Sequence, residues 1–138
     1  MKPRYPLMLL CLVFGLVPAS SRAEDAPERV FELRVYHPHP GKLAALQTRF
    51  REHTCAIFER LGMENVGYWV QADVPEGEEP KLYYVLAYPS REAAKAMWAA
   101  FLQDPEWQRV QQDSIADGWL VQKVDSIFLT AADFSAIQ

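Results

Sequence analysis

The sequence predicts one α+β domain whose strands and helices follow the order β-α-β-β-α-β. Three observations predict it: segments rich in alternating, β-branched and aromatic residues, segments with apolar residues at helical spacing, and proline or glycine at the joints between them. At 138 residues the chain has the length of a single domain. This order is the split βαβ arrangement, a ferredoxin-like fold that places its helices on one face of a four-stranded antiparallel sheet.

The first strand is predicted at residues 30–36, because side chains there alternate in character. One side of this strand carries Phe31, Leu33 and Val35, and the other side carries Glu32, Arg34 and Tyr36. The His-Pro-His-Pro run at 37–40 should end the ladder, because proline lacks the N–H donor and restricts the residue before it.

Residues 42–61 predict a helix with one apolar stripe, which ends at Gly62. Its charged residues, Arg49 among them, lie mostly off that stripe. Residues 63–72 and 82–88 predict the second and third strands, joined by an exposed hairpin loop rich in proline and glutamate.

The second half of the domain has clear helix boundaries. Ser90 is suited to cap a helix over residues 91–103. Asp104 as N-cap, with Pro105 at the first helical position, predicts another helix that runs to about residue 117. Residues 119–129 then predict the fourth strand.

Glu32, Arg34 and Tyr36 are expected on the sheet face that the helices leave open. Two large polar groups and an aromatic suit a lined cavity better than a dry core, and a second sheet packed over this face would enclose one. A ligand cavity of this kind would then lie between two sheets.

Several segments together resemble the NIPSNAP family, in its bacterial form, over about residues 30–134. They are the Phe-Glu-Leu-Arg-Val-Tyr strand, the Pro-Gly-Lys turn, the Arg-Glu-His stretch, the Gly-Tyr-Trp strand and the Asp-Pro-Glu-Trp helix start, at 31–36, 40–42, 51–53, 67–69 and 104–107. The resemblance implies a ferredoxin-like domain that pairs into a dimeric α/β barrel. It implies no settled chemistry.

The first 23 residues are typical of a secretory signal peptide. Two basic residues precede an apolar run of eleven, and small residues favour cleavage after Ala23. The run is too short for a membrane anchor, which takes about 20 residues. We therefore expect an exported domain at 24–138, periplasmic or secreted, with no membrane insertion after cleavage.

Composition excludes several functional classes. The chain has a formal net charge of −4. All charged residues of the predicted leader are basic, so the mature protein has a more negative net charge. Such a protein is poorly suited to bind nucleic acid.

Cys55 is the one cysteine after the leader and cannot form an intrachain disulfide. With no zinc pattern, phosphate loop or dinucleotide fingerprint, we expect neither a metal ion nor a cofactor.

His53, Arg34 and Tyr36 are the candidate catalytic residues. His53 lies on or beside the predicted helical stripe, where it could act as a base or bond to a neighbouring strand. Glu32 and Arg34, two apart on a strand, could bind a polar ligand or pair across a dimer interface.

The aromatic residues extend the candidate ligand-binding set, which comprises Glu32, Arg34, Tyr36, His53, Trp69 and Tyr84. Trp69 and Tyr84 could line a pocket or fill the core, whereas Trp98 and Trp107 are expected in the core. His37 and His39 resemble a metal pair, but they lack further ligands nearby and are interpreted as turn residues.

Three functions compete at this point. The first is a homodimer that binds a small, partly apolar molecule in its cavity. The second is a cofactor-independent monooxygenase- or isomerase-like enzyme that uses the same cavity, by analogy with related barrels. The third is a haem-handling protein with His53 as axial ligand.

Overall fold

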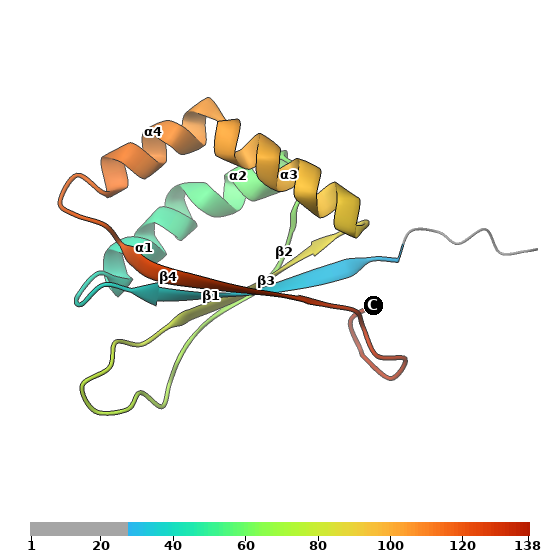
Figure 1. Cartoon of the computed structure of the whole chain (residues 1–138), viewed down its shortest axis with the longest axis horizontal. Helices are drawn as coiled ribbons and strands as arrows, with labels where there is room; N and C mark the ends of the chain where they lie inside the picture. The colour runs from blue at the N-terminus through green and yellow to red at the C-terminus, as the bar shows by residue number, and fades with distance from the viewer. Residues whose placement is uncertain (1–27) are drawn as a thin grey trace, which may run out of the picture.

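The computed structural model describes residues 28–138, and within them four strands form one antiparallel sheet in the order β2-β3-β1-β4 (Figure 1). The chain order confirms the β-α-β-β-α-β prediction. The predicted signal peptide lies outside the described residues. Within 28–138 no helix combines the length and apolar character that crossing a membrane requires.

The strands lie close to the predicted positions. They are β1 (Val30–Pro38), β2 (Glu64–Val70), β3 (Leu82–Tyr88) and β4 (Val121–Leu129). The prediction that the proline run ends the first strand at residue 36 was wrong by two residues. β1 continues to Pro38, which pairs with Val121 of β4 after a register shift at His37. The irregularity accommodates a proline at the end of the strand, where pairing with β3 has already stopped.

The first helical segment is continuous, but it is not a uniform α-helix. It consists of α1 (Leu43–Arg49), a π-helical turn η1 (Phe50–Thr54) and α2 (Cys55–Arg60). The backbone N–H of Cys55 donates to the carbonyl of Phe50, five residues back, and the Thr54 hydroxyl donates to the Arg49 carbonyl at 3.2 Å. The π turn inserts an extra residue, which changes the side chains that face the sheet after it.

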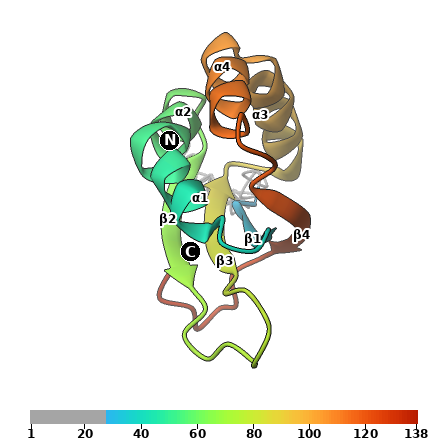
Figure 2. The same cartoon turned by 90° about the vertical axis from the view of Figure 1, so that its left-hand side faces the viewer.

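The remaining helices, α3 (Arg91–Gln103) and α4 (Pro105–Ser114), begin with the predicted caps. The Ser90 hydroxyl accepts a hydrogen bond from the Ala93 N–H at 3.1 Å. The Asp104 carboxylate accepts one from the Trp107 N–H at 3.0 Å. Figure 2 shows these helices and α1–α2 forming a single layer on one side of the sheet.

The helices cover the sheet face opposite to the one expected. Glu32, Arg34 and Tyr36 point toward the helices: Trp98 of α3 bonds to Glu32, Arg34 lies over the Trp98 ring, and Tyr36 contacts Phe50. Leu33 and Val35 therefore lie on the open face. The polar side chains are tolerated under the helices because they find hydrogen-bond partners there: Glu32 accepts from Trp98 of α3 and, within the sheet, from Tyr88 and Ser126.

The core lies between the helices and the covered face of β3, whose side chains there are fully buried or nearly so. Tyr84 is at its centre, stacked on Tyr68 at a ring-centroid distance of 5.4 Å. On the open face, the strand registers align half-buried and exposed apolar side chains, namely Leu33, Val35, Tyr83, Val85, Ile127 and Leu129. The hairpin loop between β2 and β3 and the C-terminal segment both lie on this side of the sheet (Figures 1 and 2).

Candidate functional site

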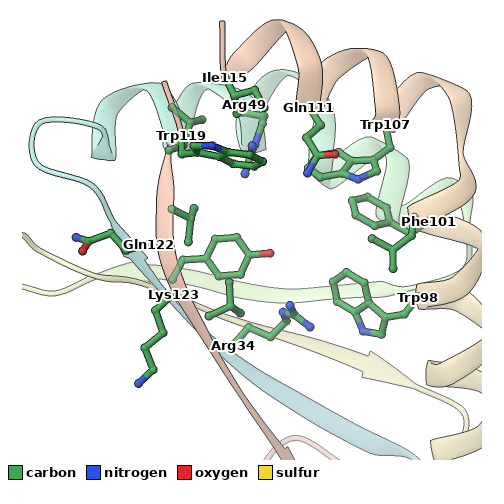
Figure 3. A pocket seen from close by; sticks show the side chains of 15 residues that line it. Arg34, Arg49, Trp98, Phe101, Trp107, Gln111, Ile115, Trp119, Gln122 and Lys123 are labelled. Atoms are coloured by element: carbon green, nitrogen blue, oxygen red, sulfur yellow. The ribbon is translucent and has the colours of Figure 1, made fainter. Parts of the chain in front are cut away.

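A cavity of about 520 Å³ lies between the helix layer and the β1–β4 side of the sheet. Figure 3 shows its aromatic wall, built by Trp98 and Phe101 of α3, Trp107 of α4 and Trp119, which precedes β4. Its volume falls in the range of small-molecule sites. The cavity thus lies within one subunit, and the expectation of a cavity between two sheets does not describe it.

Glu32 forms a fully bonded buried carboxylate beside this cavity. Its side chain accepts hydrogen bonds from Tyr88 (2.6 Å), Trp98 (2.7 Å), Ser126 (2.6 Å) and Arg34 (2.9 Å). Burial opposes its charge, but the three neutral donors and the Arg34 charge outweigh burial, so the pKa of Glu32 is below its usual value. Glu32 therefore positions its neighbours and has little capacity left for a ligand.

Arg34 joins this carboxylate to the cavity wall. Its guanidinium lies 4.1 Å from the centre of the Trp98 ring, and its Nε is buried without a hydrogen-bond partner. Burial opposes the charge, but the surrounding Tyr84, Tyr36 and Glu32 outweigh it and raise the pKa of Arg34. Arg34 is therefore a permanent cation at the cavity.

Tyr36 and Tyr84 have different positions, although both were candidate ligand-binding residues. Tyr36 lines the cavity, packed edge-on against Phe50 and Tyr84 at centroid distances of 5.6 and 5.3 Å. Tyr84 is fully buried beneath it, and burial raises the pKa of its phenol well above the usual value. Tyr84 belongs to the core.

Arg49 is a cavity residue that sequence reasoning missed. It is 8% exposed, its Nη1 donates to the Ser114 hydroxyl at 3.2 Å, and its guanidinium lies 5.2 Å from the centre of the Trp107 ring. Burial lowers its pKa. Its charge suggested an exposed position, but it is the last residue before the π turn, on the side that faces the sheet. The signal that could have found it is its spacing, three residues after the buried Leu46 on the same helix.

His53 does not reach the cavity. It lines a separate hollow between η1 and α4, together with Glu52, Arg109 and Asp113. The π turn explains this position, because Thr54 takes the buried place that a regular helix would give to residue 53. The structure therefore separates His53 from Arg34 and Tyr36.

The remaining aromatic candidates divide between the two faces. Trp69 is 54% exposed, and register with Tyr83 puts it on the open side, where its ring lies against Gly67. A Cβ at residue 67 would come within 2.5 Å of that ring. Trp98 and Trp107 pack against the core as expected, and both also line the cavity. Trp119, 65% exposed at the cavity edge, was not singled out.

The predicted turn histidine His37 bonds through Nε2 to the Asp125 carboxylate at 2.7 Å on the open face. Across residues 28–138, no group of three or more His, Cys, Asp or Glu residues is placed to hold a metal ion.

Comparison with solved structures supports the fold assignment. A NIPSNAP family protein from Agrobacterium tumefaciens is 22% identical with a TM-score of 0.68, covering 81% of this chain and 93% of its own. An uncharacterized NIPSNAP-like domain protein from Burkholderia xenovorans is 22% identical with a TM-score of 0.66, covering 78% and 89%. SnoaB from Streptomyces nogalater, a cofactor-independent oxygenase, shares the fold at 14% identity and a TM-score of 0.52, covering 80% and 99%.

A comparison with curated proteins found no match. The NIPSNAP family model matches residues 31–136, which is most of the chain and includes every strand and helix from β1 to β4 apart from the first residue of β1. The match agrees with the motifs at 31–36, 67–69 and 104–107. The chain belongs to the NIPSNAP family.

Proposed function

We propose that this protein is an exported homodimer in which each subunit binds a small, partly apolar molecule in the cavity between its helices and sheet. The observation that carries the proposal is the cavity itself: about 520 Å³, with five aromatic side chains on its wall and the guanidinium groups of Arg34 and Arg49 beside them. Apolar walls with a few fixed polar groups are typical of ligand sites.

The open sheet face supports the homodimer. Exposed large apolar side chains there include Trp69, Ile127 and Leu129, at 54%, 51% and 43% exposure. Contiguous exposed apolar surface favours association. A second copy of the chain presents the same apolar face, so two sheets packed face to face would bury it on both subunits. Export is proposed from residues 1–23, whose charge and apolar pattern is that of a signal peptide.

The second candidate function is a cofactor-independent, oxygenase-like reaction in the same cavity. It rests on the fold shared with SnoaB and on the Tyr36 phenol and Arg34 guanidinium on the cavity wall. His53, the proposed base, lines a different hollow. The binding function is therefore the one that the geometry supports best.

The proposal is tested with the neutral fluorescent probe N-phenyl-1-naphthylamine and with native mass spectrometry of the mature protein. We expect the wild type to be a dimer that binds the probe. Trp119→Ala should weaken probe binding about tenfold, because it removes an aromatic wall that is exposed and not part of the core.

Trp69→Ala is the matched control, since it removes a tryptophan of comparable exposure, 54% against 65%, that does not line this cavity. Native mass spectrometry checks that this open-face variant remains a dimer. Equal loss of probe binding in the two variants would place the probe outside the cavity and contradict the proposal. A monodisperse monomer would contradict the homodimer.

A further inference from the structure

Arg49 is a buried cation that no carboxylate neutralises. Three cations line the cavity, Arg34, Arg49 and Lys123, and no acidic side chain is part of that lining among residues 28–138. Glu32 pairs with Arg34 at 2.9 Å, and Asp125 pairs with Lys123 at 2.8 Å. Within the same residues, no Asp or Glu oxygen lies within 4 Å of Arg49.

A charge in this position is costly to the folded protein. Transferring a cation out of water is unfavourable unless it is paired and hydrogen-bonded. Arg49 is 8% exposed, makes a single side-chain hydrogen bond within the described chain, and keeps a buried Nε that bonds to nothing. Asp113 of α4, which lines the neighbouring hollow together with Arg49, is already paired with Arg109 at 3.5 Å. An anion entering the cavity would supply the missing partner.

The guanidinium is held in place for such a partner. Ser114 accepts from its Nη1 and donates in turn to the Gln111 carbonyl at 2.9 Å, and Trp107 lies beside its planar face. Figure 3 shows Arg49 entering the cavity from the helix layer, opposite Arg34 on the sheet and between Trp119 and Gln111. Fixed geometry lowers the entropy that binding would otherwise lose.

The chemistry of these groups identifies a ligand class. Nη2 and the second N–H of Nη1 make no hydrogen bond within the described residues, and together they match the two oxygens of a carboxylate, whereas a phosphate dianion would call for more than one uncompensated cation. Trp107 and Trp119 flank Arg49 with flat apolar surfaces. Resting on the function proposed above, we propose that the cavity binds a planar aromatic carboxylate, with its carboxylate on Arg49 and its ring system against Trp107 and Trp119.

The test compares 2-naphthoate with its neutral analogue 2-naphthamide by calorimetry on the mature wild-type protein. We expect naphthoate to bind at least tenfold more tightly than naphthamide. Arg49→Gln should weaken naphthoate binding at least tenfold and naphthamide binding much less, because the neutral amide loses a hydrogen bond and no charge pair. Arg51→Gln is the matched control: it removes the same charge from an exposed position of the same helix and should alter neither affinity.

The outcomes separate this inference from the binding function. Equal binding of the two probes to the wild type, or equal effects of Arg49→Gln on both, would overturn the carboxylate and leave the binding function standing. Failure of both probes to bind would overturn both.

A measurement without ligand gives an independent readout. If Arg49 serves a ligand, replacing it with an apolar side chain of similar length removes a buried, unpaired charge, so Arg49→Met should raise the melting temperature by about 4 °C. A fall in melting temperature would assign Arg49 a structural role and overturn the inference.

Discussion

The two sides of strand β1 differ: its polar side chains face the helices and its apolar side chains face the open side, the reverse of what a covering layer of helices usually selects. The covered face presents Glu32, Arg34 and Tyr36 to the helices, whereas the open face presents Leu33 and Val35 to the other side. On the covered face, polar groups are bonded to one another and border a cavity. On the open face, apolar groups have no helix above them.

The difference teaches that burial follows available partners as well as polarity. A carboxylate can lie under a helix layer when four donors surround it, as they do at Glu32. An apolar face can be left free of helices when another surface is available to pack on it. The covered face is therefore suited to ligand chemistry and the open face to association.

The largest effect is expected from Glu32→Ala, which removes the centre of the covered face. The free energy of unfolding should fall by about 3–5 kcal/mol, because the Arg34 charge would stay buried without its partner. Urea denaturation measures it. Glu64→Ala is the control: that carboxylate is 61% exposed and pairs with Arg29, so its loss should cost less than about 1 kcal/mol. Similar effects of both variants would show that the network contributes no special stability.

Ile127→Asp should break association through the open face. A carboxylate placed there would be desolvated in the dimer, so the dissociation constant should rise at least tenfold, about 1.4 kcal/mol, by sedimentation equilibrium. Leu102→Asp, at a similarly exposed residue on α3, should leave the subunit count unchanged. An unchanged dimer in Ile127→Asp would mean that the open face is not the interface.

The pH dependence of the unfolding free energy should reveal the buried carboxylate of the covered face. The pKa of Glu32 is lower in the folded protein than its ordinary value of 4.5, so folding is favoured by its ionised form. That stability is complete above about pH 4.5 and is lost as the pH falls through the lower folded-state value. Unfolding free energies measured from pH 7 to pH 3 should fall less steeply at the acidic end in Glu32→Gln. Parallel profiles for the two proteins would contradict this assignment.

The smallest expected effect concerns how the helix layer is anchored over the covered face. Ser90→Ala removes the cap of α3, which carries Trp98, and should cost about 1 kcal/mol of unfolding free energy. Thr130→Ala, at an exposed residue beyond β4, should cost almost nothing. A Ser90 effect no larger than that of Thr130 would show that the cap is energetically unimportant.

Local patterns were sufficient to predict the elements, because caps and alternating side chains are local. The segments at 82–88 and 91–103 were predicted with the bounds that the structure shows. Local patterns could not predict which face of the sheet the helices cover. Tyr88, Trp98 and Ser126 lie 56, 66 and 94 residues from the Glu32 that they bond, and polarity alone does not reveal such partners.

The candidate site was predicted only in part, because local patterns place neighbours on one strand but not residues from different elements. Arg34 and Tyr36 line the cavity together, as neighbours on one strand face must. His53 missed its expected place because helical spacing was counted at 3.6 residues per turn through a π turn. Arg49 precedes that turn and was set aside for its charge, although it lies three residues after the buried Leu46. Trp119 was predicted as the first residue of the fourth strand, but that strand begins at Val121, so Trp119 precedes it at the cavity edge.

The π turn gives the first helical segment one residue more than a regular helix of the same phase would have. Losing one residue between Phe50 and Thr54 would restore a regular helix and keep Arg49 and Phe58 on the side that faces the sheet. Losing one residue within α1 or α2 would instead rotate the two parts of the segment by about 100° relative to each other. A single-codon deletion should therefore be tolerated within this turn better than on either side of it, where it would turn either the cavity's cation or part of the core away from the sheet.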